Sequence, residues 1–306
     1  MNKLQVLVTG AAGFLGRYCA RQLSRGGVRV IGLGRGRFSD YRAFGVDRWW
    51  EGSVDAVGLA RVIAEEGPPA VIVHCAGSGS VQRSFLDPAG DFSDNVLSLV
   101  AVLEAARILR EQPRVVMISS AAVYGRSGGG PMLESFPLAP MSPYGRHKQA
   151  AEVVAESYRQ AFSVPLTVVR MFSVYGEGLR KQIFWDACAR LTRGDFCFSG
   201  SGDEVRDWIH VEDAARIIAW AATDSAADGM VINGGSGKGT RVADALAVLG
   251  RCWDPPMIPS FDGSGRRGDP DVMQADIRLL SGTGFVPTIF IDEGLARYVA
   301  WFRSVI

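Results

Sequence analysis

A tyrosine and a lysine four residues apart are the side chains best suited to acid–base chemistry. Tyr144 and Lys148 lie in the segment SPYGRHK, in which Ser142 can cap a helix and Pro143 can occupy its first position. Residues at i and i+4 share one helix face, so we expect the ammonium of Lys148 beside the hydroxyl of Tyr144. A neighbouring positive charge stabilises a phenolate and lowers the pKa of a tyrosine from its usual value of about 10. The spacing therefore predicts that Tyr144 exchanges a proton with a hydroxyl–ketone pair.

A glycine-rich turn near the N-terminus indicates a dinucleotide site. The segment TGAAGFLG follows a short apolar stretch, Gln5–Thr9, and stands at the start of a helical pattern. Its glycines, Gly10, Gly13 and Gly16, permit a tight turn and let backbone N–H groups approach a pyrophosphate at the helix N-terminus.

The end of the second apolar stretch bears on the choice of dinucleotide. An NAD site usually has an acidic residue there, which binds the adenosine ribose hydroxyls. This sequence has Gly34 followed by Arg35, and no carboxylate until Asp40. An arginine can pair with a 2′-phosphate, so we expect NADP in preference to NAD.

These residues must be positioned by a regular alternation of strands and helices. The apolar stretches are rich in Val and Ile and do not alternate with polar residues, as in strands buried on both faces. The predicted strands are Gln5–Thr9, Val28–Leu33, Ala70–Cys75, Arg114–Ser119, Leu166–Met171 and Met230–Asn233. The predicted helices are Phe14–Ser24, Asp55–Glu66, Phe92–Arg110, Pro143–Phe162, Lys181–Arg193, Asp213–Thr223 and Ile291–Arg303. The order predicts an α/β fold with a doubly wound parallel (Rossmann) sheet.

After Gly176 the alternation of strands and helices becomes less regular, which predicts a smaller, interleaved α/β substrate-binding domain. We expect residues 1–175 to form the dinucleotide-binding domain, with 208–235 returning to it. Residues 176–207 and 236–306 are then mainly the substrate-binding domain.

The composition excludes several classes of partner. Lys and Arg number 33 and Asp and Glu 32 in 306 residues, so the formal net charge of +1 gives no electrostatic case for nucleic acid or an acidic membrane. No apolar run approaches the roughly 20 residues of a membrane-spanning helix. The five cysteines are scattered without a C-x-x-C pair, which suits a reducing cytoplasm and predicts no zinc site.

Several motifs together resemble the extended short-chain dehydrogenase/reductase superfamily, and within it the NAD(P)-dependent sugar-nucleotide epimerase/dehydratase/reductase family. The motifs are TGAAGFLG, SSAAVYG, SPYGRHK, RMFSVYGEG, GDEVRDWIHVED and RRGDP, and they extend over essentially the whole chain. The resemblance implies a nucleotide-diphosphate sugar as substrate.

The resemblance also assigns roles to individual residues. It makes Ser120 a hydrogen-bond partner of the reacting substrate oxygen, and it makes Lys148 a ligand of the nicotinamide ribose. The implied cofactor-binding residues are Gly10, Gly13, Phe14, Leu15, Gly16, Arg35, Ala76, Tyr144 and Lys148. The implied substrate-binding residues are Asn95, Ser173, Phe198, Arg206 and Arg267, of which the two arginines suit a diphosphate.

One departure from the family narrows the reaction. Family dehydratases carry an Asp-Glu pair after the Ser or Thr, whereas this chain has Ala121 and Ala122, which cannot transfer protons. Hydride transfer at one sugar carbon, C4, remains. The leading expectation is a 4-keto-sugar-nucleotide reductase, and the alternative is an NAD-dependent 4-epimerase. A non-sugar dehydrogenase and a non-catalytic dinucleotide sensor are further alternatives.

The resemblance finally implies a homodimer. It places Phe92–Arg110 and Pro143–Phe162 at a two-fold interface as a four-helix bundle. Both helices carry apolar residues beyond one narrow stripe, which points to a partner. These residues are Val96, Leu99, Val100 and Leu103 on one helix and Ala150, Val153, Val154 and Tyr158 on the other.

Overall fold

The computed structural model describes residues 3–126, 128–264 and 270–306, and these form two compact units. The first unit comprises residues 1–123, 138–170 and 215–232. The second comprises residues 124–137, 171–214 and 233–306. Arg267, a predicted substrate residue, lies outside the described residues.

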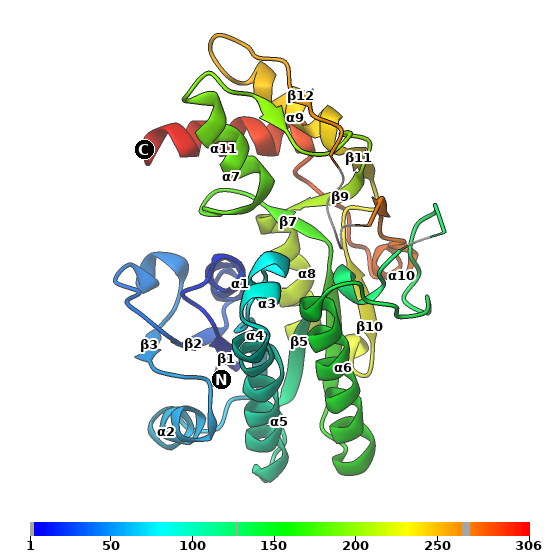
Figure 1. Cartoon of the computed structure of the whole chain (residues 1–306). Helices are drawn as coiled ribbons and strands as arrows, with labels where there is room; N and C mark the ends of the chain where they lie inside the picture. The colour runs from blue at the N-terminus through cyan, green and yellow to red at the C-terminus, as the bar shows by residue number, and fades with distance from the viewer. Residues whose placement is uncertain (1–2, 127, 265–269) are drawn as a thin grey trace. The chain divides into compact units, whose positions relative to one another are not determined.

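The first unit is built on a seven-stranded sheet in the order β10-β6-β5-β4-β1-β2-β3 within the described residues (Figure 1). The pairs β3–β2, β2–β1, β1–β4 and β4–β5 are all parallel. The strands are β1 (Gln5–Thr9), β2 (Arg29–Gly34), β3 (Arg48–Glu51), β4 (Val71–His74), β5 (Arg114–Ser120), β6 (Leu166–Met171) and β10 (Val231–Gly234). The predicted doubly wound parallel sheet is therefore confirmed.

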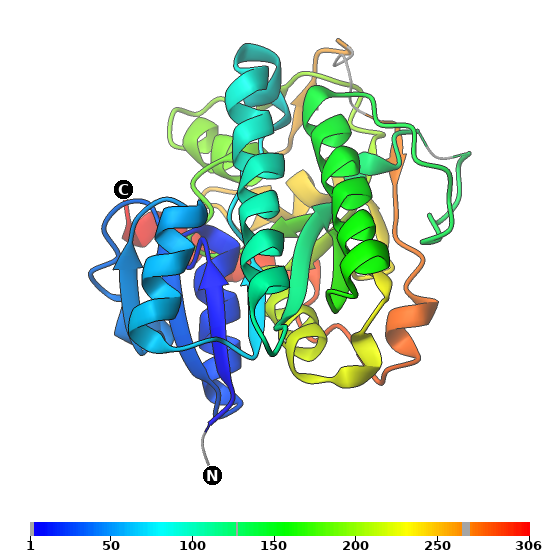
Figure 2. The same ribbon diagram turned by 90° about the horizontal axis from the view of Figure 1, so that it is seen from below.

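Helices flank this sheet on both sides. Along one face lie three neighbouring helices, α2 (Ala56–Glu66), α5 (Ser98–Ile108) and α6 (Pro143–Phe162), which Figure 2 shows side by side. The first helix, α1 (Phe14–Arg25), packs against β1 and β2. The remaining elements are α3 (Val81–Leu86), α4 (Pro88–Phe92), the π-helical turn η2 (Ser93–Leu97), α8 (Val211–Thr223) and the short helical turns η1 (Tyr41–Phe44), η3 (Ala121–Val123) and η4 (Ser225–Ala227).

The strand interiors explain why the sheet is parallel. β1 and β2 are buried along their length apart from their first residues, and β4 and β6 are buried throughout. Their Val, Ile and Leu side chains meet those of α2, α5 and α6 in one apolar cluster. Burial on both faces is what a parallel sheet covered by helices requires.

The second unit contains smaller sheets and four helices within the described residues. Its strands are β7 (Ser173–Tyr175), β8 (Cys197–Phe198), β9 (Val205–His210), β11 (Gly239–Arg241), β12 (Ser260–Phe261) and β13 (Val272–Met273). Its helices are α7 (Gln182–Leu191), α9 (Val242–Arg251), α10 (Arg278–Ser281) and α11 (Ile291–Ser304). Across both units, none of the helices that the structure describes is long and apolar enough to cross a membrane.

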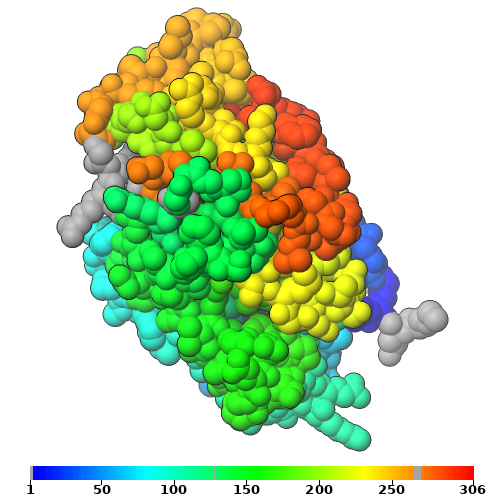
Figure 3. All heavy atoms as spheres, turned by 90° about the vertical axis from the view of Figure 1, so that its right-hand side faces the viewer, coloured from blue at the N-terminus to red at the C-terminus, as the bar shows by residue number. Residues whose placement is uncertain are grey.

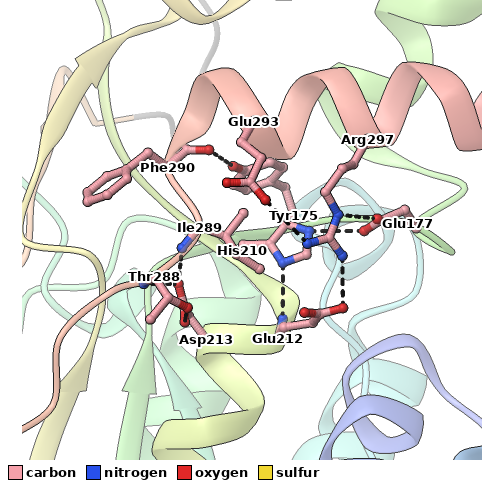
Figure 4. A network of polar contacts seen from close by, with 10 residues as sticks. All are labelled: Tyr175, Glu177, His210, Glu212, Asp213, Thr288, Ile289, Phe290, Glu293 and Arg297. Carbon is pink, nitrogen blue, oxygen red and sulfur yellow. Dashed lines mark hydrogen bonds and ion pairs between the residues drawn. The ribbon is translucent and has the colours of Figure 1, made fainter.

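A polar network holds α11 to the loop after β7 and to the first turn of α8 (Figure 4). Arg297 of α11 donates to Glu177 and to Glu212, each at 2.8 Å. Glu177 also bonds to the Nε2 atom of His210, at 2.9 Å. The Nδ1 atom of His210 accepts the backbone N–H of Glu212, so Nε2 carries the proton that Glu177 accepts. The buried end of β9 is thus stabilised by charge-assisted hydrogen bonds.

Several apolar residues of α5 and α6 that were predicted to lie at a dimer interface lie in the core instead. Val96, Leu99 and Leu103, expected to widen the apolar surface, belong to the core, and Ala150, Val154 and Tyr158 pack against it. Other apolar side chains are exposed instead. Val153 is 65% exposed, and Phe92, Leu97, Ile108 and Phe162 are also exposed. Figure 3 shows α6, in bright green, open along one face of the molecule.

The polar network predicts a loss of stability in acid. Burial alone would raise the pKa of Glu177, but hydrogen bonds from His210 and Arg297 outweigh it and lower that pKa from 4.5 to about 2. Such a carboxylate stabilises the fold above its unfolded pKa, and this contribution is lost as the pH falls through the folded value. We expect the urea midpoint of the native protein to fall more steeply between about pH 5 and pH 2 than that of Glu177→Gln. Glu65→Gln, a change at an exposed carboxyl, is the matched control, and equal slopes for the native protein and Glu177→Gln would refute the expectation.

Candidate active site

The glycine turn lies where the order of the sheet reverses. β1 and β4 are neighbours, and the chain continues from them to opposite edges of the sheet. Gly10 follows β1 with a φ of +70°, and a Cβ on it would stand 2.7 Å from the backbone nitrogen of Ala76, which follows β4. A Cβ on Gly16 would stand 2.2 Å from the carbonyl oxygen of Gly10. Glycine at both positions lets α1 begin against the strand ends, at the edge where parallel sheets bind ligands.

The start of α1 suits an anion. Gly13 caps the helix without a side-chain hydrogen bond, and the first turn holds no acidic residue. The N–H groups of a first helical turn have no partner within the helix, and the helix dipole places partial positive charge there. The segment from Phe14 to Gly16 therefore fits the pyrophosphate of a dinucleotide.

The strand-end arginine has a partner that the sequence did not suggest. Arg35 follows β2 and pairs with Asp94 of η2, with 3.1 Å between Nη2 and Oδ1. Arg83 of α3 pairs with the other oxygen of Asp94, also at 3.1 Å. An acid is thus present at the end of β2, although it comes from a segment 59 residues further along the chain.

The structure brings Ser120, Tyr144 and Lys148 together at the end of β5. Ser142 caps α6 through the N–H of Gly145, at 3.1 Å, and Pro143 stands in the first turn, as predicted. Ser120 lies close enough to Tyr144 for its side chain to lower the pKa of the tyrosine, and the Oγ atom of Ser120 accepts the backbone N–H of Ala122, at 3.2 Å. The ammonium of Lys148 donates to the carbonyl oxygen of Ile118 in β5, at 2.9 Å. All three side chains thus converge on one strand end, where they could act on a single substrate oxygen.

The pKa of Tyr144 departs from the sequence argument. Burial raises it to about 12, a hydrogen bond with Ser120 opposes the rise, and the charge of Asp91 adds to it. Lys148 was expected to lower this pKa, but its ammonium donates a hydrogen bond to the carbonyl oxygen of Ile118. Burial also lowers the pKa of Lys148 to about 8. The expected direction for Tyr144 was wrong because the i, i+4 spacing does not reveal desolvation.

Asn95 lies close to the loop that follows β4. Its side-chain nitrogen donates to the carbonyl oxygen of Asp91, at 3.0 Å. Its side-chain oxygen is buried and has no hydrogen-bond partner among the described residues. Gly77 lies in the loop that follows β4. A Cβ at this position would stand 2.7 Å from the side-chain oxygen of Asn95, so glycine is what allows the loop and Asn95 to lie so close together. An unpartnered buried acceptor at this edge is consistent with a ligand-binding role.

Two buried polar contacts of α6, a histidine–carboxyl hydrogen bond and an ion pair, were missed by the sequence analysis. His147 bonds to Asp91, with 2.7 Å between Nδ1 and Oδ2. Glu152 pairs with Arg170 of β6 through two of its guanidinium nitrogens and accepts a bond from Ser119. Arg170 lies 18 residues after Glu152 and on a different element, so no helical spacing signals the second pair.

The predicted substrate residues of the second unit lie on its strands. Ser173 is half-buried at the start of β7, and Arg206 is buried on β9, where it donates to the carbonyl oxygen of Val205. Phe198 is buried and packs edge-on against Phe196, with ring centres 5.1 Å apart. Their substrate roles stay predictions, as does the assignment of substrate binding to this part of the chain. No group of three or more potential metal-ligating side chains occurs among the residues that the structure covers.

Known proteins resemble the chain along its whole length. The sequence model of the NAD dependent epimerase/dehydratase family matches residues 6–235. The chain is 31% identical to the UDP-glucose 4-epimerase of Mycolicibacterium smegmatis, over 98% of this chain and 99% of that protein. It is 28% identical to UDP-glucuronate 4-epimerase 4 of Arabidopsis thaliana, over 99% of this chain and 76% of that protein. The crystal structure of Thermus thermophilus UDP-glucose 4-epimerase in complex with NAD is similar at a TM-score of 0.88 and 26% identity, over 99% of this chain and 100% of that chain.

Proposed function

Because the chain belongs to the NAD-dependent epimerase/dehydratase family, we propose that it is a UDP-sugar 4-epimerase. Relatives named as 4-epimerases align with nearly its entire length, which supports the alternative from the sequence over the leading expectation of a 4-keto reductase. The observation that carries the proposal is that Tyr144, Ser120 and the buried Lys148 converge on the end of β5.

The residues after Ser120 support epimerisation over dehydration. Ala121 and Ala122 form the turn η3, where Ala121 is buried, and neither side chain can hold a proton. Dehydration needs a second acid–base group at a neighbouring carbon, because a proton and a hydroxyl group leave from different atoms. Epimerisation at one carbon needs a single group.

The proposed chemistry assigns one task to each residue. Bound NAD supplies a centre that takes up a hydride and gives it back. In its phenolate form, Tyr144 would take the proton of the sugar 4-hydroxyl as the hydride leaves C4, and would return that proton to the same oxygen when the hydride comes back, which regenerates the phenolate. Ser120 holds that oxygen by a hydrogen bond, and the ammonium of Lys148 stabilises the negative charge on Tyr144. Both the hydride and the proton are returned to the sugar, so no net oxidation or proton release follows.

The decisive experiment distinguishes an epimerase from a reductase. We expect UDP-glucose or UDP-glucuronate, incubated with the protein and catalytic NAD, to yield the C4 epimer, detected by proton NMR, without net change in NADH absorbance. A 4-keto-6-deoxy nucleotide sugar incubated with NADPH is the comparison. Stoichiometric consumption of NADPH without epimer formation would establish the reductase and refute the epimerase.

A further prediction concerns the dinucleotide, for which we propose NAD. Asp94 compensates the charge of Arg35 and can accept hydrogen bonds from ribose hydroxyls, whereas its carboxylate opposes a 2′-phosphate. We expect tighter binding of NADH than NADPH, measured by fluorescence titration. Asp94→Asn should raise the affinity for NADPH by roughly tenfold, the gain from a charge-assisted bond. Tighter binding of NADPH by the native protein would restore the NADP preference expected from Arg35.

We also propose that the chain forms a homodimer through α5 and α6. The exposed Val153 and Leu97 would be covered there, and their burial favours association. We expect light scattering to give the dimer mass for the native protein and the monomer mass for Val153→Glu, because burying a charge at an apolar contact is unfavourable. Ile258→Glu, at a side chain 90% exposed in the second unit, is the matched control and should remain dimeric. A monomeric native protein would contradict the proposal.

The proposed role of Tyr144 predicts that its substitution lowers catalytic activity but leaves cofactor binding nearly unchanged. Tyr144→Phe removes the transferable proton and keeps the ring, so kcat should fall by about 10²–10⁴-fold while cofactor affinity stays within a few-fold. Lys148→Met should impair both, because the same ammonium tunes Tyr144 and holds the ribose. Tyr158→Phe is the matched control, since this tyrosine of α6 bonds to Glu104 outside the site. Near-native activity of Tyr144→Phe would show that the proton comes from elsewhere.

A further inference from the structure

One carboxylate of α6 joins three elements of the first unit. Glu152 is buried, as are its two partners, Ser119 of β5 and Arg170 of β6. Its Oε1 atom accepts the hydroxyl of Ser119. The Nε atom of Arg170 lies 3.1 Å from Oε1 and 3.2 Å from Oε2, and its Nη2 atom donates to Oε2 at 2.7 Å. Both carboxylate oxygens thus have partners, and these come from two neighbouring strands.

The face of α6 that carries this carboxylate also carries the proposed catalytic residues. Tyr144, Lys148 and Glu152 follow one another at intervals of four residues, so they form one stripe along the helix. The stripe meets consecutive residues of β5. Lys148 donates to the carbonyl oxygen of Ile118, at 2.9 Å, and Glu152 accepts from the next residue, Ser119. The helix is therefore bonded to adjacent residues of one strand at two positions along the stripe.

The ion pair of Glu152 and Arg170 is better suited to fixing a position than to stabilising the fold. The cost of removing two charges from water can exceed their attraction, and apolar residues of similar volume often stabilise a core equally well. Apolar cores, however, lose their unique arrangement before they lose stability. Hydrogen bonds have defined lengths and directions, so they restrict how far a helix can move along a sheet.

We propose that Glu152, through Ser119 and Arg170, fixes α6 against β5 and β6 and thereby holds Tyr144 and Lys148 at the end of β5. Glu152 and Ser119 are positioning residues in this proposal, since they act through the helix and the strand. Catalytic groups have to be held within about 0.5 Å of their productive positions, and supporting hydrogen bonds serve this purpose. The consequence for catalysis rests on the proposed function, whereas the effect on the position of Lys148 is a property of the fold.

Other polar contacts of α6 lead to helices instead of strands. The backbone N–H of Tyr144 donates to the hydroxyl oxygen of Ser84 in α3, at 3.1 Å. Near the other end of α6, Tyr158 bonds to Glu104 of α5. These contacts join α6 to its neighbouring helices. The contact of Glu152 is the one that ties the helix to the strand directly before the reacting serine.

The first test compares two variants of Ser119 that have the same shape. Ser119→Thr keeps the hydroxyl and Ser119→Val lacks it, and both branched side chains suit a strand. Neither variant changes a charge, and Arg170 still bonds to both oxygens of Glu152. We expect similar urea midpoints for the two variants. We expect kcat to be about tenfold lower for Ser119→Val, because a misplacement of about 1 Å can cost roughly 100-fold and the loss of one bond permits less movement than that.

Equal kcat values of the two folded variants would overturn the proposal. A merely structural role of the hydroxyl would lower the urea midpoint of Ser119→Val and leave kcat of the folded protein unchanged. If Ser119→Val does not fold, as judged by circular dichroism, Ser119→Ala takes its place and the native protein takes the place of Ser119→Thr. The same difference in kcat is then expected, and its absence has the same meaning.

The second test asks whether Ser119 acts through Glu152. The double variant Glu152→Met/Arg170→Met removes both charges together and replaces them by unbranched apolar side chains, a change that folded proteins often tolerate. In this background Ser119→Thr and Ser119→Val should have equal kcat values, because the hydroxyl has lost its acceptor. A difference of about tenfold that persists in this background would show that Ser119 acts independently of Glu152, and would overturn the proposal.

The third test reads the position of Lys148 without substrate. The chain has four lysines, Lys3, Lys148, Lys181 and Lys238, so 13C-lysine labelling gives a simple NMR spectrum, in which the signal that Lys148→Met removes is that of Lys148. This signal should coincide in the native protein and Ser119→Thr and be displaced in Ser119→Val. Since no charge has changed, the displacement reports movement of the ammonium relative to Ile118.

The third test also separates this proposal from the proposed function. An unchanged Lys148 signal in folded Ser119→Val would overturn the positioning role, whatever the activity of the protein. Absence of any epimerase activity in the native protein would refute the proposed function, and the NMR comparison of Ser119→Thr with Ser119→Val would still decide whether the contact of Glu152 fixes the position of Lys148.

Discussion

The buried ammonium of Lys148 is the constraint around which the first unit is arranged. A charge in a low-dielectric interior is stable only with hydrogen bonds and compensating charges close by. The carbonyl oxygen of Ile118 accepts one bond from it, and Asp91 and Glu152 lie within electrostatic range. Glu152 in turn requires Arg170 to compensate it. The buried charge of Lys148 is thus surrounded by charged groups on three elements, α4, α6 and β6.

Close backbone approach is the second requirement, because the reacting groups come from separate elements. Tyr144 reaches Ser120 only if α6 begins against the turn after β5. Gly145 permits this, since a Cβ there would stand 2.5 Å from the carbonyl oxygen of Ala122. Gly10 plays the same part between β1 and the loop after β4. The glycines next to the functional residues are therefore explained by packing as well as by ligand access.

The local sequence pattern was sufficient to predict helices and strands that are uniformly buried. It was insufficient to predict contacts between side chains that lie far apart in the sequence. β1, β6 and α6 have the bounds expected from their apolar stretches and from the Ser-Pro start. The edge strand β3 was missed, because its sequence, RWWE, carries charges at both ends and lacks an apolar run. The same limit applies to charges. The acid opposite Arg35 and the histidine opposite Asp91 lie more than fifty residues away, so that no spacing rule could reveal either pair.

The high pKa of Tyr144 is compatible with epimerisation. A group that must exchange protons with solvent works best when its pKa lies near the working pH. In the proposed reaction Tyr144 returns the proton to the sugar oxygen from which it came. The pKa of the tyrosine therefore needs only to be similar to that of the sugar hydroxyl. A sugar hydroxyl is itself a weak acid, so a buried tyrosine whose pKa is raised to about 12 is closer to it than a solvated one. Once the phenolate has formed, the proton passes only between Tyr144 and the sugar oxygen, so burial does not interrupt the proposed cycle.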